Sequence, residues 1–199
     1  PLDLSDEGSV RANAFARSMP IGAELDPGGG AHFRVWAPTP KTIKLVVDGV
    51  EHAMASEPDG YRSAHVAKAR AGSRYGFRLD GDERLLPDPA SRAQPDGPHA
   101  PSAVVDPSAY RWGDAAWHGV RRESQVIYEM HVGTFTREGS WAAAIGKLPF
   151  LQDVGVSLIE MMPVAEFPGR FGWGYDGVAL FAPTRLYGAP DDLRSFIDA

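Results

Sequence analysis

Cysteine is absent from the 199 residues of this sequence. Its absence excludes a disulfide framework and a metal site built on thiolates, and it is compatible with a cytoplasmic location, which we expect. No apolar run approaches the ~20 residues of a membrane-spanning helix, so we expect no membrane association. Acidic residues outnumber basic ones by 26 to 20, and no basic stripe carries interleaved aromatic residues. A nucleic-acid partner is therefore not expected.

Other absences concern leaders, metals and cofactors. Residues 1–18 lack the apolar centre of a signal peptide, and we expect them to form a flexible leader. The histidines outside residues 125–199 are scattered and show no paired metal-ligand spacing, so no metal site is predicted. The glycines at 28–30 are not followed by the Lys-Ser/Thr pair of a phosphate-binding loop. We expect no cofactor.

Residues 19–85 show the alternation of β-strands. Their hydrophobic pattern predicts strands at 32–36, 42–47, 61–66 and 74–79. Asp48 and Gly49 form a hairpin-turn pair, and further glycines separate the other strands. Several short strands with such turns predict a small antiparallel β-sandwich. Residues 86–124 are rich in proline, and we interpret them as a linker packed over a domain surface.

Residues 125–199 have the texture of an α/β domain. Strands are predicted at 126–132 and 156–162, the second nearly continuous in apolar character, as parallel strands are. Between them, a helix over 141–154 is predicted to begin after Ser140 and to end at Gly155, with Pro149 kinking or shortening it. A second helix opens at Pro190. This order is the start of a parallel α/β domain.

The stretch 160–190 is the most informative part of the chain. It reads as the end of a buried strand that opens into a long loop rich in glycine and aromatic residues. A sugar-binding site is one of the few sites that need this combination, because an aromatic face offers apolar contact to the C–H side of a pyranose.

Four motifs carry a resemblance to a known family. They are Tyr128-Glu-Met-His-Val-Gly-Thr-Phe-Thr136, Leu151-Gln-Asp-Val-Gly155, Met162-Pro-Val-Ala-Glu-Phe167 and Trp173-Gly-Tyr-Asp-Gly177. Together they resemble the α-amylase superfamily and, more narrowly, are similar to the maltooligosyltrehalose trehalohydrolase family. Glycogen branching and debranching enzymes resemble the chain too, but they usually carry Gln or Asn where Asp176 stands.

The resemblance implies an immunoglobulin-like β-sandwich, of the carbohydrate-binding-module type, followed by a (β/α)8 barrel. Such a barrel takes roughly 250 residues, so residues 125–199 hold only its first units. The family implies a retaining α-glycosidase that needs no cofactor. It would hydrolyse the α-1,4 bond next to the trehalose unit of maltooligosyl trehalose, so its partner is that sugar or a related α-glucan.

The resemblance also implies the substrate-binding residues. Tyr175 would stack on the sugar next to the cleaved bond, Asp176 would shape the same subsite, and Trp173 would build a wall of it. Alternatively, Tyr175 and Asp176 simply hold the loop together and Trp173 packs between its two glycines. Glu166 is expected to stabilise the loop as an acceptor.

No catalytic residue is assigned. Residues 76–80 match by letter the motif that carries the family's nucleophile, but they lie in the β region, where a strand ending in a turn at Asp80 explains them. Glu129 and His131 are expected to share a face of their strand as a polar pair inside the barrel. The family's catalytic carboxylates would lie on later strands, so this chain alone is expected to be inactive.

Two other functions stay open: part of a branching or debranching enzyme, and a stand-alone glucan-binding or scaffold protein. We expect weak or no glucan binding by residues 20–110 alone, because no clear row of exposed Trp or Tyr is found there. Two parallel strands cannot close a barrel. In the free 199-residue chain we therefore expect residues 125–199 to be poorly ordered, dimerised or protected by further sequence.

Overall fold

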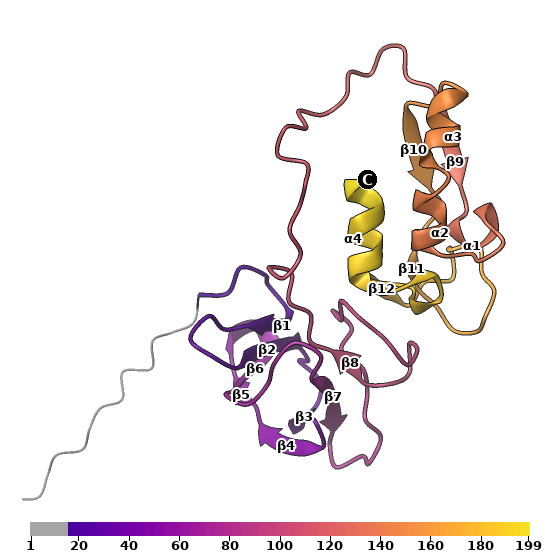
Figure 1. Ribbon diagram of the computed structural model, residues 1–199. Helices are drawn as coiled ribbons and strands as arrows, with labels where there is room; N and C mark the ends of the chain where they lie inside the picture. The colour runs from indigo at the N-terminus through magenta and orange to yellow at the C-terminus, as the bar shows by residue number, and fades with distance from the viewer. Residues whose placement is uncertain (1–15) are drawn as a thin grey trace, which may run out of the picture.

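The computed structural model describes residues 16–199 (Figure 1). The regular secondary structure of this part is mostly β-sheet, with two four-stranded and two two-stranded sheets and no closed barrel. The expected leader lies outside the described residues except for its last three. Of these, Arg17 is tied to the fold, because its guanidinium donates to the carbonyl oxygens of Gly22 and His32 at 2.8 and 3.0 Å. The folded part therefore begins earlier than position 19.

Eight strands form the two larger sheets, which are antiparallel throughout. One sheet has the order β1-β2-β6-β5, and the other has the order β4-β3-β7-β8. The strands are β1 (Gly22–Leu25), β2 (Ala31–Trp36), β3 (Ile43–Val47), β4 (Val50–Ala53), β5 (Ala55–Ser56), β6 (Tyr61–Val66), β7 (Arg74–Leu79) and β8 (Ser102–Ala103), with a 3-10 turn η1 (Pro58–Gly60) before β6. The four strands predicted from the sequence are confirmed as β2, β3, β6 and β7.

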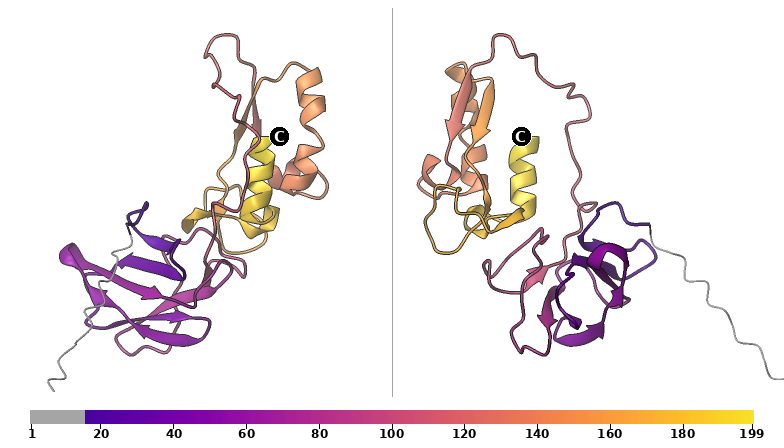
Figure 2. Two further views of the ribbon diagram at one scale, coloured as in Figure 1. Left: turned by 60° about the vertical axis from the view of Figure 1, so that its left-hand side comes forward. Right: turned by 180° about the vertical axis from the view of Figure 1, so that it is seen from behind.

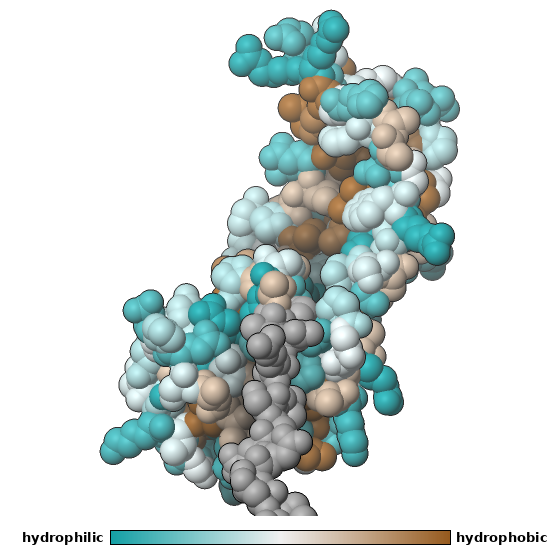
Figure 3. Space-filling model, turned by 90° about the vertical axis from the view of Figure 1, so that its left-hand side faces the viewer, coloured by the Kyte–Doolittle hydropathy of each residue, from teal (hydrophilic) through white to brown (hydrophobic). Residues whose placement is uncertain are grey.

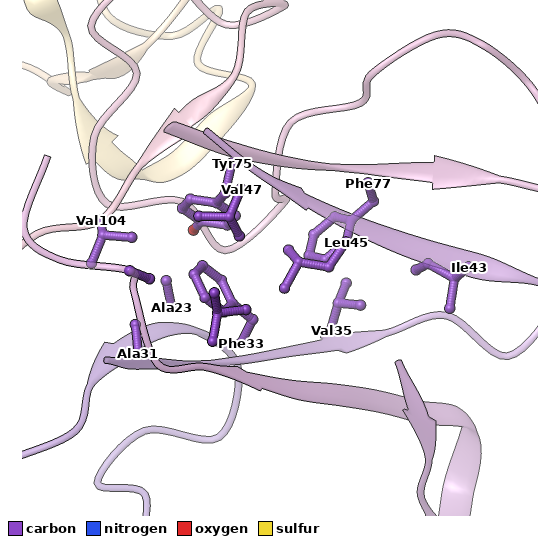
Figure 4. Packing of buried hydrophobic residues seen from close by; sticks show 12 residues of the cluster. Ala23, Ala31, Phe33, Val35, Ile43, Leu45, Val47, Tyr75, Phe77 and Val104 are labelled. Carbon is purple, nitrogen blue, oxygen red and sulfur yellow. The ribbon is translucent and has the colours of Figure 1, made fainter. Parts of the chain in front are cut away.

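The core of this unit lies between the two sheets (Figure 4). Phe33 of β2 and Leu45 of β3 are both completely buried and come from opposite sheets. Tyr75 of β7 packs edge-on against Phe33, with ring centroids 4.9 Å apart. Side chains that alternate along each strand thus bury one face of each sheet against the other, as the period-2 pattern predicts.

The turns follow local rules. The hairpin between β3 and β4 closes at Asp48 and Gly49, which both have positive φ (48° and 82°). That combination suits a tight two-residue hairpin turn. Asp80 also has a positive φ, 50°, and its carboxylate accepts the backbone N–H of Thr42 at 2.8 Å. Asp80 is therefore a turn residue, as the sequence predicts.

The segment predicted as a linker is in part built into this unit. Its strand β8 pairs with β7, and the bridge Phe77–Leu86 adds to the same sheet. Ser91 and Gln94 are buried, and the hydroxyl of Ser91 donates to the amide oxygen of Gln94 at 2.9 Å. Residues 86–104 thus pack into the two-sheet unit, whereas residues 107–124 contain no helix or strand.

The rest of the chain holds a parallel strand pair with helices on one side (Figure 2). In the pair, β9 (Ile127–Met130) and β10 (Leu158–Met161) align Leu158 with Ile127 and Met161 with Met130. The helices are α1 (Val132–Phe135), α2 (Trp141–Ile145), α3 (Leu148–Asp153) and α4 (Pro190–Asp198). The parallel pair and the start of α4 at Pro190 are as predicted. The helix predicted over 141–154 is interrupted near Pro149, as expected: it is split into α2 and α3, and Pro149 lies in the first turn of α3.

A second core joins these elements. Trp141 of α2 is fully buried and packs against Phe196 of α4 and Tyr187, with ring centroids 5.3 and 5.9 Å apart. Ser140 accepts the backbone N–H of Ala143, which confirms it as the cap of α2. At the other end of α4, Asp198 accepts the backbone N–H of Gly113, so this core is also tied to the segment before β9.

The other face of the strand pair is uncovered. Ile127 is 59% exposed, and Glu129 and Glu160, aligned on neighbouring strands, are both exposed. Apolar surface gathers in the upper part of the molecule, where Figure 1 places β9 and β10 (Figure 3). A two-stranded sheet with one uncovered face is only marginally stable, and its exposed apolar surface favours contact with other chains.

Asp88 gives a pH-dependence to test. It is 2% exposed and accepts hydrogen bonds from the Tyr75 hydroxyl and the Ala90 N–H, both at 2.8 Å. Burial raises the pKa of the Asp88 carboxyl above its ordinary value of 3.8. Above an unfolded-state pKa of about 3.9, the unfolded chain then binds fewer protons than the folded one, so this group lowers the free energy of unfolding as pH rises.

We expect the stability of the natural chain relative to Asp88→Asn to decline from about pH 4 upward until the raised pKa is passed. Urea unfolding at several pH values measures this. Asp82→Asn is the matched control, because Asp82 is exposed and hydrogen bonds from Arg84 lower its pKa. Its contribution is lost only as pH falls, so the control difference should stay flat above pH 4. An equally flat difference for Asp88→Asn would contradict the assignment.

Candidate functional site

The carboxyl ends of β9 and β10 lie side by side, and both lead into irregular chain. His131 and α1 follow β9 directly. The segment that follows β10 runs from Met162 to Ala189, and we call it the aromatic loop. It contains the antiparallel pair β11 (Ala165–Glu166) and β12 (Ala179–Pro183) and the 3-10 turn η2 (Arg185–Tyr187). In parallel α/β folds, ligands meet this end of the strands.

A buried ion pair joins the two ends of the aromatic loop. Glu166 is completely buried, and its carboxylate accepts both the guanidinium and the backbone N–H of Arg185, the latter at 2.7 Å. Thr184, also fully buried, accepts the N–H of Leu186 and caps η2. Glu166 therefore stabilises the loop as an acceptor, as the sequence predicts.

Three glycines of the aromatic loop allow its later residues to lie in close contact with its first residues. A Cβ built on Gly172 would lie 2.8 Å from the ring of the buried Phe167, and one on Gly177 would lie 2.7 Å from Ala165. Gly174 has a φ of +97°, and a Cβ there would overlap the carbonyl oxygen of Pro163. Only glycine permits such close approach. Because the backbone at Gly172 and Gly174 is packed against the start of the loop, the side chains beside and between these two glycines point to solvent.

The outward residues are the aromatic ones. Phe171, Trp173 and Tyr175 are 86%, 75% and 70% exposed, and Asp176 next to them is exposed as well. The structure thus brings the three predicted site residues together on one projecting segment. Among residues 16–199 no backbone amide donates to Asp176, and Trp173 is not packed between its glycines. The alternative in which these residues hold the loop together receives no support from this geometry.

His131 joins the first strand to the loop. Its Nε2 lies 2.8 Å from the carbonyl oxygen of Gly172 and 3.2 Å from the Tyr187 hydroxyl, and its Nδ1 lies 3.1 Å from the Thr134 hydroxyl. The polar pair expected for His131 and Glu129 was wrong, because the imidazole contacts Gly172, Tyr187 and Thr134 while Glu129 stays exposed. Burial raises the pKa of the Tyr187 hydroxyl.

Other features of the described residues are separate from this loop. A surface hollow of about 410 Å³ on the two-sheet unit is lined in part by Lys41, Lys44, His52 and Arg62. Within residues 16–199, no three His, Asp or Glu side chains gather in a way that could hold a metal ion. The helices described here include none of the length and apolarity needed to cross a membrane.

Comparison with solved structures defines the class. The chain superposes on a putative α-amylase from Salmonella typhimurium with a TM-score of 0.86 and 47% identity, covering 92% of this chain and 31% of that one. It also shares its fold with a pullulanase from Bacillus acidopullulyticus, at a TM-score of 0.71 and 21% identity. The chain therefore shares its fold with 31% and 28%, respectively, of the length of these two proteins.

Comparison with curated sequences finds relatives of one kind at higher identity. The chain is 46% identical over 180 residues to the malto-oligosyltrehalose trehalohydrolase of Deinococcus radiodurans, covering 90% of this chain and 30% of the relative. It is 48% identical over 171 residues to the same enzyme of Mycobacterium tuberculosis, covering 84% and 29%. No family model matches the chain. The resemblance predicted from the motifs is confirmed, and the chain spans about 30% of the length of these curated relatives.

The role of Gly174 can be tested against a matched glycine. Gly169 has nearly the same φ, +94°, but a Cβ there would meet nothing within 4 Å. Gly169→Ala should therefore lose only the cost of that backbone conformation, on the order of 1–2 kcal/mol. Gly174→Ala must also displace the Pro163 carbonyl, and we expect at least about 1 kcal/mol more. Urea unfolding of both variants measures the difference; equal losses would show that the contact with Pro163 does not hold the loop.

Proposed function

We propose that this chain is the substrate-contacting first part of a glycoside hydrolase that releases trehalose from maltooligosyl trehalose. The observation that carries the proposal is the aromatic loop, in which Trp173 and Tyr175 are 75% and 70% exposed beside Asp176 at the strand ends. The similarity to malto-oligosyltrehalose trehalohydrolases over 84–92% of the chain supports the choice of substrate.

We also propose how the two parts of the fold belong to known architectures. The two-sheet unit would be an immunoglobulin-like β-sandwich that includes Arg17 and residues 86–104, and residues 107–124 would link it to the next part. The parallel pair β9 and β10, with α2, α3 and α4, would be the first units of a (β/α)8 barrel. The open face that carries Glu129 and Glu160 would then look into the barrel.

The chemistry of the loop suits recognition. The rings of Tyr175 and Trp173 offer flat apolar faces to the C–H side of a pyranose, and they need no rearrangement to do so because the glycines hold the backbone between them. The Asp176 carboxylate accepts sugar hydroxyls through charge-assisted hydrogen bonds. In this arrangement Tyr175 and Asp176 form the subsite and Trp173 forms its wall.

The loop does not suit cleavage by itself. A retaining glycosidase needs two carboxyl groups about 5 Å apart, one as nucleophile and one as acid and base. Of the two carboxylates of the loop before Arg185, Glu166 is buried and neutralised by Arg185, which leaves only Asp176 exposed. We therefore assign sugar binding and no catalytic step to these residues, with no metal or cofactor.

An alternative is a branching enzyme. The chain is 33% identical over 208 aligned positions to the 1,4-alpha-glucan branching enzyme GlgB of Pseudomonas fluorescens, covering 90% of this chain and 28% of the relative. The higher identity to the trehalohydrolases and the Asp at position 176 favour trehalose release. We further propose that the protein is cytoplasmic and has no nucleic-acid or membrane partner. The uncovered face of the strand pair would favour dimerisation of the isolated chain.

Titration of the 199-residue chain with maltoheptaose, followed by NMR, tests the binding role. Tyr175→Ala and Trp173→Ala should each weaken the affinity on the order of three- to tenfold, because each removes one stacking face. Phe150→Ala is the control, since Phe150 is 62% exposed but lies on α3, away from the loop.

If maltoheptaose binds equally well to all three variants, the loop is not the sugar site. Binding to residues 20–110 alone, at millimolar affinity or tighter, would instead favour the glucan-binding sandwich. For any longer protein that carries this sequence, release of trehalose from maltooligosyl trehalose separates the trehalohydrolase from the branching enzyme.

A further inference from the structure

We propose that His131 is a positioning residue, which fixes the aromatic loop through the carbonyl group of Gly172. The expected effect on sugar binding rests on the proposed function, whereas the effect of His131 on the loop does not. His131 stands one residue beyond β9, whereas Gly172 lies in the middle of the loop, just before Trp173. Their contact, 2.8 Å from Nε2 to the carbonyl oxygen, joins two segments separated by 41 positions.

The partners of the ring decide where its protons lie. A carbonyl oxygen only accepts, so the nitrogen that faces Gly172 must carry a hydrogen. In the neutral ring Nδ1 is then the acceptor. The Thr134 hydroxyl lies 3.1 Å from Nδ1 and 3.3 Å from the carbonyl oxygen of His131, and its single hydrogen serves one of these two acceptors at a time. The tautomer that binds the loop is therefore set by the carbonyl oxygen of Gly172, which can only accept.

Packing holds the ring in place. The Tyr187 ring stands edge-on to the imidazole, with centroids 6.0 Å apart, and is itself packed against the buried Trp141. Gly133 lets both rings approach, since a Cβ there would lie 2.8 Å from Tyr187 and 3.0 Å from His131. The imidazole is thus seated on the rigid core while its Nε2 points to the loop.

The consequence falls on the residues that follow Gly172. The peptide group whose oxygen His131 binds links Gly172 to Trp173, so the hydrogen bond sets the direction in which the indole leaves the backbone. Gly174 fixes the next point on Pro163, and Tyr175 comes directly after it. His131 and Gly174 are therefore two points that aim the two aromatic rings.

Two polar variants separate this role from simple packing. In His131→Gln the amide nitrogen lies as many bonds from the backbone as Nε2, so the donor to Gly172 is kept. In His131→Asn the amide reaches only as far as Nδ1, so the contact with Thr134 can be kept and the donor to Gly172 is lost. Both variants are smaller than histidine and polar, and the signals of the buried Trp141 verify that the core is folded.

The measurements are the 15N heteronuclear NOE of the amides of residues 172–175 and of the Trp173 indole, and the maltoheptaose affinity of the 199-residue chain. For His131→Asn we expect lower NOE values and an affinity on the order of three- to tenfold weaker, the effect of one hydrogen bond. His131→Gln should stay within about twofold of the natural chain. Exposed His118→Gln is the control and should change neither readout.

If Asn and Gln variants behave alike, whether both like the natural chain or both equally loosened, the hydrogen bond to Gly172 does not position the loop and the inference is overturned. Failure of the proposed function looks different. In that case maltoheptaose affinity would be insensitive to Tyr175→Ala, while the NOE values of the His131 variants would still decide the positioning role.

Discussion

The burial of the Glu166 charge is the constraint on which the rest of the site depends. A carboxylate removed from water is costly unless it is paired and hydrogen-bonded, and Arg185 provides both a cation and a backbone N–H. Because Glu166 and Arg185 flank the aromatic segment, their pairing closes the loop and leaves the residues between them to project.

Closure of the loop has consequences on both sides. Towards the core, it brings Tyr187 onto Trp141 and lets α4 begin at Pro190, so the second core is completed by residues that follow the loop. Towards the two-sheet unit, the guanidinium of Arg185 lies against Gly97, where a Cβ would be 3.5 Å from it. One ion pair therefore connects the loop, the helix behind it and the segment that packs on the sheets.

Much of this fold could be predicted because local rules decide it. Alternating side chains fixed the four main strands, the pair Asp48 and Gly49 fixed a hairpin, and Ser140 fixed the start of a helix. The split between α2 and α3 was harder. The hydrophobic period continues across the break, so the pattern alone favours one helix, although Pro149 was a signal for the interruption.

The residues of the candidate site could be predicted from the sequence, but the contact that positions them could not. Trp173, Tyr175 and Asp176 stand out in the sequence, whereas the role of His131 depends on its partners in the loop. The period of two relates His131 to Glu129 only, and it carries no information on a contact with Gly172. The contact with Gly172 spans 41 positions and leaves no periodic trace in the sequence. Long-range hydrogen bonds of this kind become visible only in three dimensions.

The open face of the strand pair follows the same physical logic. Glu129 and Glu160 are aligned on adjacent strands, and like charges placed side by side repel each other. Water relieves this repulsion while both carboxylates are exposed, as they are here. Covering the face would remove that water, so any chain that packs there must bring cations or hydrogen-bond donors to the pair. In the proposed barrel those groups would come from strands that face β9 and β10 across its interior. The two glutamates therefore constrain which groups can pack on this face, in addition to the apolar residues beside them.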